Sequence, residues 1–209
     1  MMQSTSYKLT EFFIIFICIP VSFAIHFAIW IKMAIAVLGF LYVIYVLLKL
    51  EKNKFKVAKG LNWKAFWRQT LIKLVVIAII TTLYMFWVDK DNLFIVLMTK
   101  PMLWTMILFI YSVFSVYPQE LIYRTFFFQR YEQLFKNRYL FIIVNAAVFS
   151  LAHIFFRNTL VMFLTFIGGI LFALTFKKTK STLLVSIEHA IYGCWLFTVG
   201  MGNMLGFPS

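Results

Sequence analysis

The sequence predicts an all-α protein, a polytopic bundle of about seven transmembrane helices. Of its 209 residues, 63% are hydrophobic and the mean hydropathy is +0.91, whereas a soluble domain is nearer half apolar. The apolar runs are long enough to span a bilayer. The basic residues lie in the short connectors between these runs, as the orienting charges of membrane proteins do. The net charge of +13 therefore does not indicate nucleic-acid binding.

Seven apolar runs define the expected spans, because each approaches the length of about 20 residues that a helix needs to cross a bilayer. The first run follows Lys8 and lacks a good cleavage site, which favours a retained span over a signal peptide. The fourth contains Pro118, so we expect either one kinked span or two pieces. In chain order the runs cover residues 12–30, 33–49, 70–88, 102–129, 139–156, 159–176 and 182–202.

Lysine and arginine alternate between rich and poor connectors, and this alternation predicts the orientation. The rich connectors follow the second, fourth and sixth runs, which places the N-terminus in the cytoplasm and the C-terminus outside. Aromatic residues interleave with the lysines of the first rich connector, so it is either an interfacial helix on anionic lipids or a solvated loop. Its basic and aromatic residues are Lys49, Lys52, Lys54, Phe55, Lys56, Lys59, Trp63, Lys64, Phe66, Trp67 and Arg68.

The fourth, fifth and seventh apolar runs contain polar motifs, whose residues are costly at membrane depth and persist when they are paired, hydrated or used. Glu120 and Arg124 are four residues apart, so they share a helix face and can pair. A salt bridge or a lone histidine in a helix can be purely structural. The three groups together nevertheless contain enough for a reactive centre. They comprise Gln119, Glu120 and Arg124, then Phe149 and His153, then Glu188 and His189.

Depth within the bilayer allows these groups to share one polar chamber. Counted from the cytoplasmic ends at about 1.5 Å per residue, Glu120 lies ~15 Å deep, His189 ~11 Å and His153 ~21 Å. A carboxylate can take a proton from water while one histidine holds that water, and the other histidine can donate to the oxyanion. The set fits peptide hydrolysis. Zinc binding by one Glu and two His is the rival interpretation, but the HExxH spacing is absent, which favours a site without metal or cofactor.

These residues, in this order, resemble the CPBP family of intramembrane proteases, which comprises CAAX-processing endopeptidases and bacteriocin-processing or Abi proteins. The family pattern is Glu-Glu-x-x-x-Arg, then Phe-x-x-x-His, then His-x-x-x-Asn or Asp. It is matched over residues 102–202 by Glu120 and Arg124, by Phe149 and His153, and by His189. The resemblance implies a glutamate that activates water with the first histidine, and a second histidine that stabilises the oxyanion with the Asn.

The resemblance also predicts the organisation of the chain within one integrated membrane domain. Residues 1–101 would form a three-span region with a basic cytoplasmic loop, and residues 102–209 would form the catalytic core. The expected location is a prokaryotic-type inner or plasma membrane. The expected partners are a membrane-associated protein or peptide substrate and anionic lipids.

Two positions depart from the family pattern. Gln119 stands where the first glutamate is usual, and Gly193 stands where Asn or Asp is usual. Either Glu120 takes over as base, or activity is altered or lost. Asn145 or Tyr192 can replace the missing oxyanion donor. Gln119, Asn145 and Glu188 are the candidate substrate-binding residues, with Glu188 able to orient a histidine or cap a backbone group.

The sequence therefore predicts an intramembrane peptidase with Glu120 as base, His153 as water-holder, His189 as oxyanion donor and Arg124 orienting the carboxylate. Two alternatives stay open. A catalytically impaired relative would act as a bacteriocin-immunity factor or membrane scaffold, as the changes at Gln119 and Gly193 suggest. A small transporter or proton channel would use the buried carboxylate and histidines as a relay, although no inverted repeat supports it.

Overall fold

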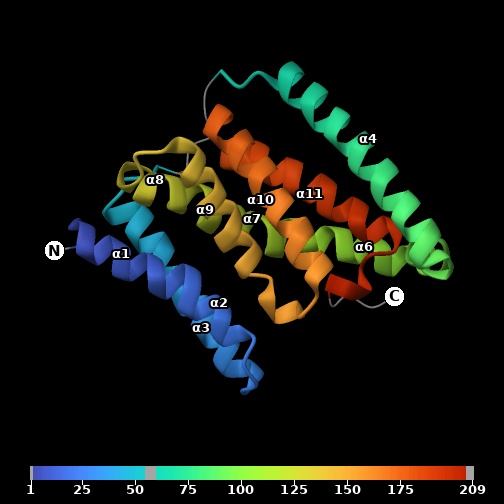
Figure 1. Ribbon diagram of the computed structural model, residues 1–209, viewed down its shortest axis with the longest axis horizontal. Helices are drawn as coiled ribbons and strands as arrows, with labels where there is room; N and C mark the ends of the chain where they lie inside the picture. The colour runs from blue at the N-terminus through green and yellow to red at the C-terminus, as the bar shows by residue number, and fades with distance from the viewer. Residues whose placement is uncertain (1, 55–59, 206–209) are drawn as a thin grey trace. The chain divides into compact units, whose positions relative to one another are not determined.

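The computed structural model describes residues 2–54 and 60–205, which are helical with no strand among them. Seven helices in this part of the chain are long and apolar enough to cross a membrane, which confirms the predicted fold class (Figure 1). They are Thr5–Phe23, Ile29–Lys49, Trp63–Val88, Pro101–Leu134, Arg138–Phe156, Thr159–Thr179 and Thr182–Val199.

The first and third spans begin seven residues earlier than the hydropathy pattern predicts, because polar caps start both helices, and the second begins at Ile29 instead of residue 33. The first begins at Thr5 instead of residue 12, where the Ser4 side chain accepts a hydrogen bond from the Tyr7 amide. The third begins at Trp63 instead of residue 70, since the Asn62 side chain accepts from the Ala65 amide at 2.9 Å. The aromatic and basic residues from Trp63 to Arg68 therefore form the first turns of a span. Phe55, Lys56 and Lys59 lie outside the described residues.

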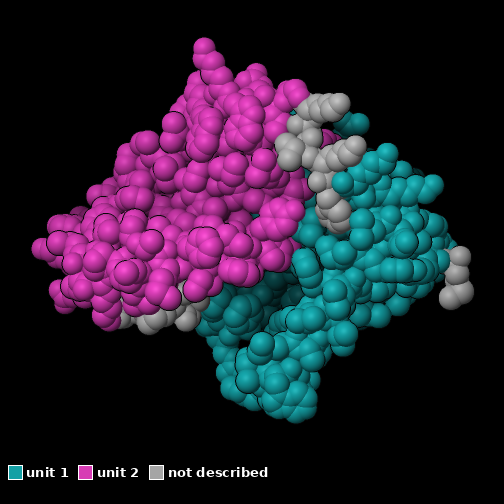
Figure 2. Space-filling model, turned by 180° about the vertical axis from the view of Figure 1, so that it is seen from behind, with its two compact units in different colours: residues 1–56, 119–178 teal, residues 57–118, 179–209 magenta. Residues whose placement is uncertain are grey.

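The chain divides into two compact units, which are coloured separately in Figure 2. Unit 1 contains residues 1–56 and 119–178, and unit 2 contains residues 57–118 and 179–209. The helices of unit 1 are α1 (Thr5–Phe13), η1 (Ile14–Cys18), α2 (Ile19–Phe23), α3 (Ile29–Lys49), η4 (Leu121–Phe126), α8 (Phe127–Tyr131), η5 (Glu132–Leu134), α9 (Arg138–Leu151), η6 (Ile154–Phe156) and α10 (Thr159–Thr179). Those of unit 2 are α4 (Trp63–Val88), η2 (Lys90–Asn92), α5 (Ile95–Thr99), α6 (Pro101–Ile110), η3 (Tyr111–Val116), α11 (Thr182–Val199) and η7 (Asn203–Leu205), and α7 (Tyr117–Glu120) contains the boundary.

The fourth span continues through Pro118 as one helix, which answers the question that the sequence left open. The π-helical segments η3 and η4 lie on either side of the short α7, which carries Pro118 and Glu120. Proline lacks an amide hydrogen and its ring crowds the preceding turn, and a wider π turn accommodates such a break in the hydrogen-bond ladder. Segments of this kind often occur at functional sites.

The core of unit 1 is aromatic. Phe16 of η1 and Phe127 of α8 are both completely buried, and their rings meet edge to face with centroids 5.2 Å apart. Helices α9 and α10 approach closely at Gly169, where an added Cβ would lie 2.9 Å from the Cα of Ala146. Small residues permit such close contact between membrane helices. The carboxylate of the fourth span and the histidine of the fifth therefore belong to a tightly packed unit.

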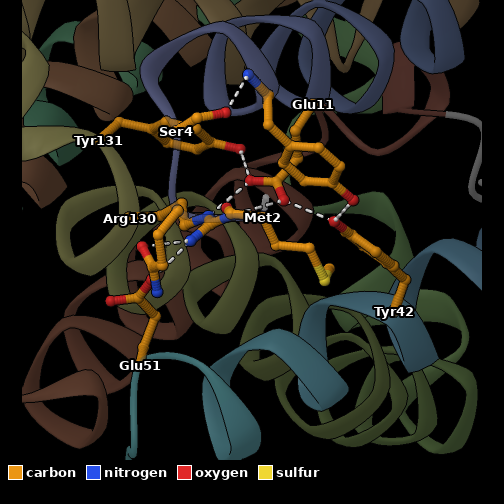
Figure 3. A network of polar contacts seen from close by, with 9 residues as sticks. Met2, Ser4, Glu11, Tyr42, Glu51, Arg130 and Tyr131 are labelled. Atoms are coloured by element: carbon orange, nitrogen blue, oxygen red, sulfur yellow. Dashed lines mark hydrogen bonds and ion pairs between the residues drawn. The ribbon is translucent and has the colours of Figure 1, made fainter.

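A buried polar network holds α1 to α8 in unit 1 (Figure 3). Arg130 donates from Nε to Glu11 Oε1 at 2.8 Å and from Nη2 to Glu11 Oε2 at 3.1 Å. The hydroxyls of Tyr131 and Tyr42 donate to the same carboxylate at 2.7 and 2.5 Å. Arg130 also donates to Glu51 at 2.9 Å. Both buried charges are thus paired and hydrogen-bonded, as burial in low dielectric requires.

In unit 2, α11 lies alongside α4 and also packs against η3 (Figure 1). The Trp195 indole of α11 donates to the Thr81 hydroxyl of α4 at 2.9 Å. Helix α11 ends at Val199 and is capped by Gly200, whose φ of 106° is the left-handed conformation that favours glycine. Helix α11 is therefore held by neighbours from the third and fourth spans.

Candidate active site

The predicted pair of Glu120 and Arg124 forms within the fourth span. Arg124 Nε lies 3.2 Å from Glu120 Oε2, and both side chains are completely buried. The Arg124 guanidinium also lies over two aromatic rings, 4.6 Å from the centroid of Phe149 and 5.7 Å from that of Phe172. Planar guanidinium groups stack on ring faces in this way. The carboxylate is thus held by a partner that is itself held by the helices α9 and α10.

Phe149 connects this ion pair to His153. Its backbone carbonyl accepts a hydrogen bond of 2.8 Å from His153 Nδ1, and the two rings lie 5.0 Å apart. A carbonyl oxygen can only accept, so Nδ1 carries the hydrogen and the neutral ring has its acceptor at Nε2. The Phe-x-x-x-His spacing therefore has a physical meaning in this chain. The phenyl ring supports Arg124, and the carbonyl sets the tautomer of His153.

The two candidate substrate-binding residues of unit 1 have different environments. Gln119 is partly buried and lies in α7 directly before Glu120. Asn145 is completely buried in α9, and its Nδ2 donates to the Tyr123 carbonyl at 2.6 Å. Arg124 Nη1 donates to the same carbonyl at 3.3 Å. Asn145 therefore fastens α9 to the π-helical segment η4, and its role in binding substrate stays a prediction.

Glu188 of unit 2 forms an ion pair with Lys73, a residue that the sequence analysis did not single out. Glu188 is completely buried, whereas the Lys73 side chain is 28% exposed. The Tyr192 hydroxyl lies 3.0 Å from Glu188 Oε1 and 3.2 Å from the Thr70 carbonyl, both within hydrogen-bond distance. The carboxylate therefore ties α11 to α4. An isolated lysine within the third apolar run was the signal that could have identified this partner.

His189 lies beside Glu188 in α11 and is 6% exposed. Its ring meets the ring of Tyr111 from η3 almost at right angles, with centroids 6.0 Å apart and an interplanar angle of 82°. Because Glu188 and His189 are adjacent in a helix, their side chains point in directions about 100° apart. Glu188 thus packs toward α4 while His189 packs toward η3.

The candidate residues form two sets. Unit 1 contains Glu120, Arg124 and His153, which are linked through Phe149. Unit 2 contains His189 together with the ion pair of Glu188. The action of the two sets on one substrate stays a prediction.

The rival interpretation, a zinc site, requires several ligand side chains close together. Within residues 2–54 and 60–205, no group of three or more His, Cys, Asp and Glu side chains lies together as a metal ion would require.

Comparison with known proteins places these residues in a family. Residues 100–195 match a protein-family model described as type II CAAX prenyl endopeptidase Rce1-like. Searches of curated proteins and of solved structures returned no match. The matched range includes every candidate catalytic residue, namely Glu120, Arg124, His153 and His189. Residues 100–195 of this chain therefore form a domain of the Rce1-like, or CPBP, family of CAAX proteases.

Proposed function

We propose that this protein is an intramembrane endopeptidase that hydrolyses a peptide bond of a membrane-associated protein or peptide. The observation that carries the proposal is Glu120, a completely buried carboxylate in a helix long and apolar enough to cross a membrane. Such a group is a functional candidate by default. The match of residues 100–195 to a protease family supports the reaction class. The proposed catalytic core spans residues 102–209, following the three-span region 1–101.

The first half of the reaction uses the side chains of unit 1. Glu120 takes one proton from a water molecule, and His153 Nε2 accepts a hydrogen bond from its second hydrogen. The water oxygen then attacks the peptide carbonyl carbon, and a tetrahedral oxyanion forms. Arg124 orients the carboxylate through the 3.2 Å contact between Nε and Oε2. General-base assistance of this kind typically contributes about 10²–10⁴ in rate.

The second half needs a donor for the oxyanion and a proton for the leaving group. His189 donates a hydrogen bond to the oxyanion, which lowers the energy of the tetrahedral state. Glu120 returns its proton to the amide nitrogen as the carbon–nitrogen bond breaks. The water oxygen thus ends in the new carboxyl group of one product, and the proton that Glu120 took ends on the new amine of the other.

The basic connectors support an orientation with the N-terminus in the cytoplasm and the C-terminus outside. We propose a prokaryotic-type inner or plasma membrane, where lysine-rich segments face anionic lipid headgroups. This orientation places the buried carboxylate in the inner half to the middle of the bilayer. A labelling experiment on single cysteines placed in successive connectors would test it.

The decisive experiment uses the full chain, purified and reconstituted in vesicles that contain anionic lipid. A library of membrane-anchored peptides, prenylated and unprenylated, is added in water labelled with heavy oxygen, and products are identified by mass spectrometry. We expect cleavage with the label in the new carboxyl group. The variants Glu120→Gln, His153→Ala and His189→Ala should each abolish cleavage while circular dichroism shows native helix content. Full activity in all three would rule out this mechanism.

The departures at Gln119 and Gly193 favour one second candidate, a catalytically impaired relative that acts as an immunity factor or membrane scaffold. This candidate requires binding to a membrane partner without hydrolysis. Two results would support it. The wild-type protein would release no labelled product, and the three variants above would still bind the partner.

A further inference from the structure

Gly193 leaves a notch on α11, and a tyrosine from η3 fills it. A Cβ built on Gly193 would lie 2.0 Å from the Tyr111 hydroxyl oxygen and 2.4 Å from both Cε1 and Cζ of the same ring. No real side chain tolerates such separations. The Tyr111 hydroxyl therefore occupies the space in which any side chain at position 193 would begin.

The Tyr111 ring is held in this notch from two sides. It meets Phe197 edge to face with centroids 4.8 Å apart, and it meets His189 with centroids 6.0 Å apart. All four residues belong to unit 2. Because Phe197 and His189 flank the ring, it cannot swing aside without losing both contacts. The absence of a side chain at position 193 and the position of Tyr111 are thus two parts of one arrangement.

The notch lies beside the proposed oxyanion donor. Gly193 follows His189 by one turn, so both lie on the same face of α11. The ring contacts of Tyr111 need only a phenyl group, and the hydroxyl adds a hydrogen-bond donor at Gly193, one helical turn from His189. Tyrosine hydroxyls are among the groups that form oxyanion holes.

We propose that Tyr111 is a second oxyanion donor and acts beside His189. Its hydroxyl supplies from η3 the hydrogen bond that the amide of an Asn at position 193 would supply from α11. This inference rests on the proposed function, and it assigns a catalytic role to a residue outside the three sequence motifs. With Tyr111 in this role, a chain that has Gly193 still has two hydrogen-bond donors for the oxyanion, His189 and Tyr111.

The first test removes only the hydroxyl. In Tyr111→Phe the ring contacts with His189 and Phe197 stay, so we expect kcat for peptide cleavage to fall by about 10²–10³ while KM changes little. Tyr84→Phe, on α4 with 39% exposure, is the matched control and should keep the wild-type kcat. A purely structural role for Tyr111 predicts a lower thermal midpoint with normal kcat in the folded fraction. That result, or wild-type kcat in Tyr111→Phe, would overturn the proposal.

The second test moves the donor from one helix to the other. Gly193→Asn alone should be inactive, because the new side chain meets Tyr111. Tyr111→Ala alone opens the notch but removes the hydroxyl. The double variant Tyr111→Ala with Gly193→Asn has both the space and an amide donor, and we expect at least about tenfold higher kcat than Tyr111→Ala alone, part of the contribution of one oxyanion donor. A folded double variant no faster than Tyr111→Ala would count against the exchange of donors.

The failure of this inference can be told apart from the failure of the proposed function. If Glu120→Gln abolishes cleavage and Tyr111→Phe does not affect kcat, the peptidase stands and the role of Tyr111 falls. If Glu120→Gln cleaves as fast as the wild type, or the wild type cleaves no peptide, the peptidase falls and the role of Tyr111 falls with it.

Discussion

Glu120 of unit 1 and Glu188 of unit 2 are both completely buried in helices that can span a membrane, yet they are held in different ways. Glu120 pairs with Arg124 of its own helix, one turn away. Glu188 pairs with Lys73 of another helix, 115 residues away in the sequence. The guanidinium of Arg124 is completely buried over Phe149, whereas the Lys73 side chain is 28% exposed.

The difference suggests different tasks for the two carboxylates. The ion pair of Glu120 and Arg124 lies within one helix, so it does not join that helix to another. We infer that this pair orients the Glu120 carboxylate. A pair between two helices fastens them together, and Tyr192 adds a further contact to the same carboxylate at 3.0 Å. We therefore propose a reactive role for Glu120 and a positioning role, through α11 and His189, for Glu188.

The largest expected effect is on catalysis and separates the two carboxylates directly. Glu120→Gln removes the proposed base and should lower the cleavage rate by about 10²–10⁴. Glu188→Gln keeps an acceptor for Lys73 and Tyr192, so we expect a loss of less than about tenfold, the effect of a small displacement of His189. Cleavage rates in vesicles give both numbers. Equal losses in the two variants would show that the assignment of roles is wrong.

The next effect is on stability and concerns the partner of Glu120. Arg124→Met removes the ion-pair partner of a completely buried carboxylate and also the stacking over Phe149. We expect the free energy of unfolding to fall by about 3–5 kcal/mol, as for other broken buried pairs. Titration with SDS in mixed micelles measures it. A loss below about 1 kcal/mol would mean that this pair contributes no more than an exposed one.

A smaller loss is expected at the partner of Glu188. In Lys73→Met the Tyr192 hydroxyl stays within hydrogen-bond distance of Glu188, and the lost lysine was partly exposed. The free energy of unfolding should therefore fall by about 1–3 kcal/mol, the cost of an incompletely satisfied buried group. The same SDS titration compares it with Arg124→Met, and the comparison fails if Lys73→Met is the more destabilising of the two.

The smallest effect is expected at Tyr192. Tyr192→Phe removes the hydroxyl that lies near Glu188 and the Thr70 carbonyl, while the ring stays in place. Hydrogen bonds between membrane helices contribute about 0.6 kcal/mol on average and about 1.7 at most. A double-mutant cycle with Lys73→Met measures whether the two contacts to Glu188 are coupled. Additive losses would mean that Tyr192 and Lys73 act independently.

Local periodicity explains what could be predicted about the site. Glu120 and Arg124, like Phe149 and His153, are four residues apart, and residues at this spacing are neighbours on any helix. Both contacts form as the spacing indicates. The pairs of Glu188 with Lys73 and of Glu11 with Arg130 join different helices, and no spacing rule reports on them. Arg130 directly follows the fourth predicted run, 102–129, and so falls in a connector predicted to be cytoplasmic, although its side chain is completely buried.

Hydropathy by itself predicted an all-helical protein with seven segments able to cross a membrane, because a lipid environment demands about 20 apolar residues for each crossing, and the described residues contain seven helices that are long and apolar enough. It also determined which segments carry the costly polar groups. The tertiary structure decided how those groups are held: Lys73 against Glu188, Arg124 over Phe149, and the Tyr111 hydroxyl in the space that Gly193 leaves open. These contacts depend on the rotation and close approach of whole helices, which side-chain packing sets and a one-dimensional pattern does not contain.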